Sequence, residues 1–143
     1  MEQLFLNIIQ RIAEAMPELS LVDEDYGQLE TQEDTYPVTF PCVLVGNIDT
    51  DWEDRPGQQR GHSSFTVRLA VDCYADTYVG SGTEQAITER QQMSHALYKT
   101  LSHYTAGGLV TSLVRTKSHD YTAPHGIKVY QHTFIFRQTE EDQ

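Results

Sequence analysis

Apolar residues recur with helical spacing in two parts of the chain, near its start and after its middle. The first stripe covers about four turns and predicts a helix from Leu4 to Met16, which Pro17 ends because proline cannot donate the next backbone hydrogen bond. The second stripe predicts a helix from Thr83 to Tyr104, with a Gly107-Gly108 pair expected to end it. The stripes consist of Leu4, Phe5, Ile8, Ile9, Ile12, Ala13 and Met16, and of Ala86, Ile87, Arg90, Met93, Leu97, Leu101 and Tyr104.

Alternation of apolar and polar residues predicts a hairpin between the two helices. Its strands run from Cys42 to Ile48 and from Phe65 to Cys73, and the charged residues 49–64 between them are expected to form the turn region. A turn centred between residues 57 and 58 makes the two cysteines cross-strand neighbours, which we interpret as reduced, small apolar side chains. This register puts Val43 and Val45 on the outer face of the sheet, where either a partner chain or a neighbouring acidic segment would cover them.

The end of the chain predicts a second hairpin, with strands 109–117 and 127–137. Phe134 and Phe136 fall on one face of its last strand and Ile135 on the other, which is typical of an inner strand or an oligomer contact. With a short strand over 19–22, the order is helix, strand, long hairpin, helix, hairpin. This order predicts a single α+β domain over 1–143, with a mainly antiparallel sheet of about four to five strands and two helices packed on one face.

The distribution of charge along the chain argues against several classes of function. Residues 23–36 are acidic and polar, so we expect an exposed arm or loop there, and the acidic tail 139–143 is expected to fray. The net charge of −11, from 21 acidic and 10 basic residues, argues against binding nucleic acid or anionic membranes. No apolar run reaches the ~20 residues of a membrane span, and no basic segment typical of a secretory signal opens the chain. We therefore expect synthesis in the cytosol.

Motifs of catalysis and cofactor binding are missing from the sequence. It contains no GxSxG elbow, no phosphate-binding loop and no HExxH pair. The chain has six histidines, of which His119, His125 and His132 flank the last hairpin and are the basis of one alternative, a small metal-dependent hydrolase. We nominate no catalytic residue, no metal ligand and no cofactor, and expect a protein that is not an enzyme.

The charged region of the long hairpin supplies candidate contact residues. Asp49, Asp51, Glu53 and Asp54 lack the glycine and glutamate of a calcium loop, which favours a solvated hairpin tip. Trp52 lies among these charges, and an indole there is either tucked under the loop or an interface anchor, of which we favour the second. The interface residues that we predict are Val43, Val45, Trp52 and Ile135.

The order and lengths of the elements resemble those of phage and prophage tail-terminator (tail-completion, minor tail) proteins. The resemblance spans nearly the whole chain: helix 4–16, the entry from Pro37 to Pro41 into strand 42–48, the long charged hairpin loop, strand 65–74, helix 83–104, and a closing hairpin that ends in Phe134-Ile135-Phe136-Arg137. It is a pattern of elements and carries no residue signature.

The resemblance implies a structural assembly protein. Such a protein would form a ring, commonly a hexamer, that terminates the tail tube and contacts the tail-tube protein and the head-side connector. It would be found in the host cytoplasm during assembly and then in the virion tail. In that setting the acidic loop around Asp49 to Asp54, or the arm, would face the DNA channel and repel phosphates. A head-closure or neck connector protein and a bacterial adaptor domain are the other non-enzymatic alternatives.

Overall fold

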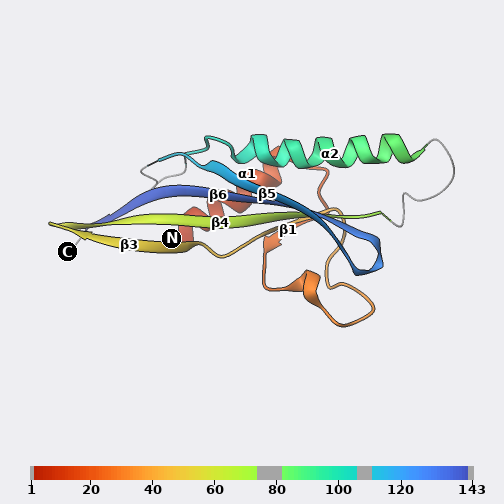
Figure 1. Cartoon of the computed structure of the whole chain (residues 1–143), viewed down its shortest axis with the longest axis horizontal. Coiled ribbons are helices and arrows are strands. Elements are labelled where there is room, and N and C mark those ends of the chain that lie inside the picture. Colours follow the sequence, from red (N-terminus) through yellow and green to blue (C-terminus); the bar gives the residue numbers. More distant parts are fainter. Residues whose placement is uncertain (1, 74–81, 106–110, 142–143) are drawn as a thin grey trace.

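The secondary structure joins two helices to one sheet (Figure 1). The computed structural model describes residues 2–73, 82–105 and 111–141, and these form two α-helices and a six-stranded, mostly antiparallel sheet. The predicted α+β fold is confirmed, with slightly more strands than expected. In chain order the elements are α1 (Glu2–Ala15), β1 (Leu21–Glu24), a 3-10 turn (Gln28–Glu30), β2 (Cys42–Val45), β3 (Asp49–Arg55), β4 (Gln58–Asp72), α2 (Gly82–Leu101), β5 (Val114–Ala123), a 3-10 turn (Pro124–Gly126) and β6 (Ile127–Glu141).

The sheet is built around its two longest strands. Its order is β1-β2-β4-β6-β5, and β3 pairs with the first half of β4 beyond the end of β2. Only the β1–β2 pair is parallel among the described strands. β6 lies between β4 and β5 and is therefore an inner strand, one of the two possibilities that its apolar residues on both faces predicted.

Both helices pack on the same face of the sheet. The predicted stripe of α1 is buried at Leu4, Ile8, Ile12 and Met16, against a sheet surface of aliphatic and aromatic side chains. Each large apolar side chain buried in this way contributes about 1.5–3 kcal/mol relative to an exposed one. The partners in this core are Val43, Val45, Phe65, Val67, Leu69, Val71, Leu97, Leu101, Leu113, Tyr130, Phe134 and Phe136.

α2 ends at Leu101, earlier than the predicted Tyr104. His103 adopts a left-handed backbone conformation with φ of 62°, which stops the helix without a glycine. Its N–H donates to the carbonyl of Leu113, and the Leu113 N–H donates to the carbonyl of Tyr104. The end of the helix is thus fixed to the start of the last hairpin. Gly107 and Gly108, which were predicted to end the helix, lie outside the described residues.

The predicted register of the long hairpin is wrong by an odd number of residues. Cys42 faces Ala70 in place of Cys73, so the cysteines are not neighbours, and Val43 faces Leu69 on the helix side of the sheet. Two features cause the shift. The turn lies at Pro56-Gly57, and one extra residue stands on the β2–β3 side between the pairs that end at Val45 and begin at Asp49. At this irregularity the backbone of Gly46 approaches Thr66 so closely that a Cβ would lie 2.9 Å from the Thr66 hydroxyl.

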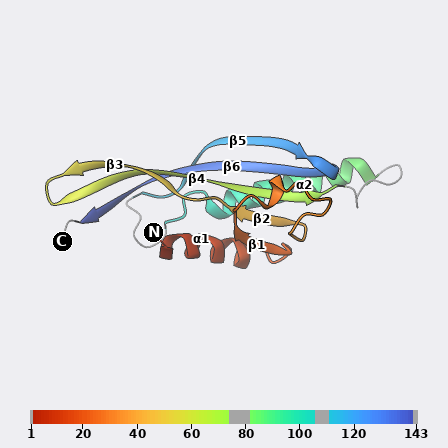
Figure 2. The same cartoon turned by 90° about the horizontal axis from the view of Figure 1, so that it is seen from below.

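The charged region 49–64 is a strand pair and not a loop. β3 pairs with β4 from Asp49 opposite Ser64 to Arg55 opposite Gln58. The tail predicted to fray also belongs to the sheet as far as Glu141, which pairs with Gln58. β3, the first half of β4 and the last part of β6 form a three-stranded extension, defined by residues 49–55, 58–64 and 135–141. It projects past the N-terminal end of α1 (Figure 2).

Candidate interaction surfaces

The outer face of the sheet, opposite the helices, is partly covered by the segment between β1 and β2, residues 25–41. This segment contains most of the predicted arm 23–36, whose first two residues belong to β1, and we call it the arm from here on. Leu29, Tyr36, Val38 and Phe40 of the arm pack against a second apolar cluster formed by the sheet. The cluster consists of Cys42, Leu44, Ala70, Ala123, Ile127 and Val129. The arm, one of the two covers expected from the sequence, therefore lies on this face. Burial raises the pKa of the Cys42 thiol to about 11, so it stays protonated beneath the arm.

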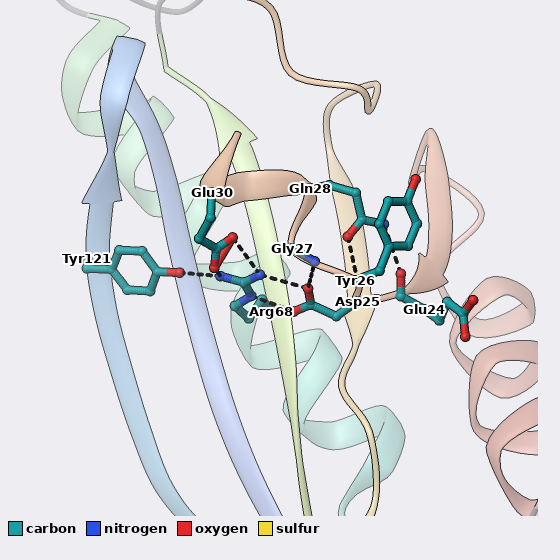
Figure 3. A network of polar contacts seen from close by, with 8 residues as sticks. All are labelled: Glu24, Asp25, Tyr26, Gly27, Gln28, Glu30, Arg68 and Tyr121. Carbon is teal, nitrogen blue, oxygen red and sulfur yellow. Dashed lines mark hydrogen bonds and ion pairs between the residues drawn. The ribbon is translucent and has the colours of Figure 1, made fainter. Parts of the chain in front are cut away.

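Arg68 fixes the arm to the sheet (Figure 3). Its Nε and Nη2 donate to the two carboxylate oxygens of Asp25, at 2.7 and 2.9 Å. Nη1 donates to Glu30 Oε1 at 2.7 Å and to the Tyr121 hydroxyl at 2.8 Å, and Nη2 also reaches Glu30 Oε2 at 3.2 Å. One guanidinium thus joins the arm, β4 and β5. We call Arg68, Asp25, Glu30 and Tyr121 the arm clamp.

The arm clamp is a buried ion pair on one side and an exposed one on the other. The side chains of Arg68 and Asp25 are 8% and 15% exposed, whereas that of Glu30 is 60% exposed. Burial alone would lower the pKa of Arg68, but the hydrogen bonds that Arg68 donates to Glu30 and Asp25 outweigh it and raise the pKa. The bidentate contact with Asp25 is therefore the contact whose loss would leave a charge buried without its partner.

Sequence reasoning missed the clamp although a signal for it was present. Arg68 is the one basic residue in the alternating strand Phe65 to Cys73, and the arm supplies acidic residues without any basic one. A single arginine on a strand that continues in the core needs an acidic partner. Local hydrogen bonds also stabilise the start of the arm, because the Gln28 side chain accepts a hydrogen bond from the Tyr26 N–H and donates one to the Glu24 carbonyl. At its far end the Tyr36 hydroxyl donates to the carbonyl of Pro124.

In the extension, the indole of Trp52 lies against a glycine of the neighbouring strand. Trp52 pairs with Gly61, and a Cβ on Gly61 would lie 2.9 Å from the indole ring and 2.7 Å from the Thr50 methyl group. The indole is 40% exposed. Beside it, the Thr50 hydroxyl bonds the Ser63 hydroxyl, and the Gln138 amide donates to Ser63. The sheet thus places a half-exposed aromatic side chain against Gly61.

The predicted acidic residues lie along β3, on two faces of the extension. Asp49, Asp51 and Glu53 alternate onto the outer face, and Asp54 lies on the face of Trp52. Glu53 forms an ion pair with Arg55 and lies 3.8 Å from His62. All four acidic residues are exposed, so a solvated acidic surface stands where the sequence predicted one.

Beyond the arm, the outer face carries an open depression of about 510 Å³. Ile135 and Val114 form a cross-strand pair there and are 43% and 44% exposed. Polar residues surround the pair, among them Asp49, Asp51 and Arg137. This is a half-polar surface with an apolar centre, which resembles a small protein contact more than a ligand cavity.

The four predicted interface residues separate into two groups. Val43 and Val45 have no exposed surface, because the register places them in the core beneath the helices, and the prediction for these two is wrong. Trp52 and Ile135 are exposed on opposite faces of the extension. For these two, a contact with a partner stays a prediction.

The three histidines near the last hairpin do not converge. His119 lies on the outer face and stacks on Tyr121, His132 lies on the helix side, and His125 lies in the turn between the strands. Within 2–73, 82–105 and 111–141, no group of three or more His, Cys, Asp or Glu side chains could hold a metal ion.

One histidine, His132, does form a hydrogen bond with a serine, but the histidine is the donor, which is the opposite of what catalysis requires. Arg115, which can only donate, approaches His132 Nδ1 at 3.2 Å, so in the neutral ring Nε2 carries the proton and donates to Ser94 Oγ at 3.0 Å. A general base would instead accept the serine proton. Burial, with the charge of Arg115, lowers the pKa of His132 to about 4. We therefore interpret the pair as a buried polar link between α2 and β6.

No family model matches the chain, and no curated protein matches it. Among solved structures it is similar to a chain of a structure described as the virion of a native gene transfer agent particle. The match has a TM-score of 0.58 and 12% sequence identity, and it covers 93% of this chain and 92% of the other. At this identity the likeness is one of fold, and it extends over nearly the whole of both chains. Neither described helix is long and apolar enough to cross a membrane.

Proposed function

We propose that this chain is a structural assembly protein of a phage or prophage tail, without enzymatic activity. Copies of it form a ring that ends the tail tube and joins it to the head-side connector. Its partners are other copies of itself, the tail-tube protein and the connector protein. It acts in the cytoplasm of the bacterial host during assembly and afterwards in the virion tail.

The observation that carries the proposal is the full-length fold similarity to a virion chain. The match covers 93% of this chain and 92% of the other. Fold alone does not define function, so the surfaces must support the same conclusion. They do so because the accessible features are exposed strands and an anchored indole, which suit protein contacts.

The acidic strand β3 has a natural role in such a ring. Asp49, Asp51, Glu53 and Asp54 are exposed on an extension that projects from the body. Carboxylates that line a channel repel DNA phosphates, and DNA then passes without being held. We propose that part of this acidic surface faces the channel, and that the chain has no specific affinity for nucleic acid.

A head-closure or neck connector protein would use the same kind of surfaces, because the related structure is a whole virion. The distinction lies in the partner. A tail terminator binds the end of the tube protein, and a head-closure protein binds the portal side of the head.

Co-sedimentation of the purified chain with polymerised tail-tube protein, and separately with the head-side connector, tests the proposal. We expect the chain to bind tube ends at a stoichiometry of one ring per end, visible as a cap by negative-stain electron microscopy. Binding to the connector alone would favour the head-closure alternative, and binding to neither would contradict a role in the virion.

A further inference from the structure

The sheet ends in two open strands of opposite charge. Among the described residues, β5 pairs only with β6, and β3 pairs only with β4, so each has a row of backbone groups with no strand beside it. The edge made of β1 and β3 has six acidic residues and one basic residue, a net charge of −5, whereas β5 has two basic residues and one acidic, a net charge of +1. We propose that β3 of one copy pairs with β5 of the next copy, head to tail. This inference rests on the proposed ring and names its subunit contact.

The strand directions fit such a joint. β3 runs parallel to β6 because both are antiparallel to β4, and β5 runs antiparallel to β6. β3 is level with residues 135–141 of β6 and β5 with residues 127–135, so the two strands meet only if neighbouring copies are displaced along the strand direction. In a ring whose strands are inclined to its axis, as in a barrel, neighbouring copies are displaced in this way and keep the same sense of strand direction. β3 then meets the next β5 antiparallel, which is the arrangement of every described strand pair except β1–β2. A joint between two different edges is heterologous, and rotation closes it into a ring.

The charges also match face by face. Continuing one sheet into the next places outer face beside outer face. Asp51 is level with Arg137 of β6 and Lys117 with Thr133, so a displacement of four positions along the strands brings Asp51 of one copy beside Lys117 of the other, and Asp49 beside His119. Within the described part of the chain, neither Asp51 nor Lys117 has a side-chain hydrogen bond or ion pair, so both are available. Val114, exposed at the start of β5, adds apolar contact at the same joint.

The features that protect β5 make the joint selective. An edge lysine and a bulge are common devices against indiscriminate strand pairing, and β5 has both, at Lys117 and between Arg115 and Lys117. A positively charged edge still admits a negatively charged one, and it rejects a second copy of itself. The same reasoning disfavours pairing of β3 with β3 of another copy.

Charge exchange across the joint tests the inference. Asp51→Lys and Lys117→Glu are each measured for self-association by sedimentation velocity, alone and as an equimolar mixture, beside wild-type protein. We expect each single variant to associate about tenfold more weakly than wild type, because like charges then meet at every joint. In the mixture, β3 of Asp51→Lys meets β5 of Lys117→Glu, so opposite charges again lie at the two substituted positions and association returns to near the wild-type constant.

Two controls of matched charge change are Glu84→Lys and Lys99→Glu, both exposed on α2. They should associate like wild type, and thermal melts should show all four variants folded, because every substituted side chain is exposed. Single variants that associate like wild type, or a mixture that stays dissociated, would overturn the inference. So would a wild-type chain that remains monomeric at every concentration. The proposed function has a separate test in the binding of tube protein, which could succeed through other surfaces.

Discussion

The body of the sheet and the extension are continuous in hydrogen bonding but differ in what covers them. In the body, helices lie on one face and the arm on the other, and the strands carry apolar residues on both sides. In the extension the same strands continue with polar residues, and β3 is exposed at six of its seven positions. The two regions of the sheet therefore differ in role. The body provides stability, and the extension provides strand surface that is accessible to other molecules.

Several polar side chains are buried and hydrogen-bonded in the body, whereas in the extension most polar side chains are exposed to water. In the body, the buried Arg68, His132 and Ser94 each have hydrogen-bond partners. In the extension, acidic residues such as Asp51 remain in water, where they cost little and stay available. We therefore expect substitutions in the body to change stability, and substitutions in the extension to change association.

The largest effect is expected at the arm clamp. Arg68→Ala leaves Asp25 buried without its partner, so we expect the free energy of unfolding to fall by about 3–5 kcal/mol, measured by urea denaturation. Glu30→Gln is the matched control, because that carboxylate is 60% exposed and its contact with Arg68 is worth about 1 kcal/mol or less. Equal losses in the two variants would contradict the division of the clamp into a buried and an exposed half.

Acid should weaken the body through His132. Its pKa is lowered to about 4 in the folded protein from 6.5, so the unfolded chain binds the proton more readily. The stability that neutral His132 contributes is complete above pH 6.5 and is lost as pH falls towards 4, by about 3 kcal/mol in total. Unfolding of wild type and His132→Gln at several pH values isolates this contribution. The wild-type curve should fall more steeply between pH 6.5 and 4, and parallel curves would refute the assignment.

Within the extension, Gly61→Ala should displace the indole of Trp52. The new Cβ would meet the ring at 2.9 Å, so we expect Trp52 to turn into water at a cost of about 1 kcal/mol. Trp52 is the single tryptophan, so its fluorescence emission reports the change directly as a red shift. Ser64→Ala, on the opposite face of β4, should leave the emission unchanged. An unshifted spectrum in Gly61→Ala would mean that the indole is not held by the glycine.

The smallest effect on stability, and a clear one on association, is expected at Ile135. Ile135→Ser removes an exposed apolar side chain at the centre of the open depression, so the free energy of unfolding should change by no more than about 0.5 kcal/mol. Association with other copies or with tube protein should nevertheless weaken. Val43→Ser is the contrasting variant, since that residue is fully buried and its substitution should destabilise the fold. If Ile135→Ser associates as strongly as wild type, the surface around Ile135 is not a contact surface.

The sequence predicted the body much better than the extension. Strong apolar periodicity located α1 and the core strands, because residues such as Ile8 and Val67 have one place to be buried. Polar alternation over 49–64 has no such requirement, so a strand pair there was interpreted as a loop. The register failed for a related reason: one extra residue near Gly46 inverts the faces of β2, and no apolar pattern marks it, since Cys42 to Val45 are apolar on both faces.

The candidate surfaces were predicted in part. Trp52 and the acidic residues of β3 stood out as isolated residue types among charges, and they are exposed as expected. Arg68 was not found because its partners lie 43 and 38 positions away in the chain. Contacts at that separation depend on how the arm folds back, which local patterns do not encode.

Amide hydrogen exchange on the free and the assembled protein tests the central claim most directly. We expect peptides covering Asp49–Arg55 and Val114–Ala123 to gain protection on assembly, because their open edges become paired. Peptides from α1 and the centre of β4 should exchange as before. Assembled protein in which these two strands exchange at the rate of the free chain would contradict it.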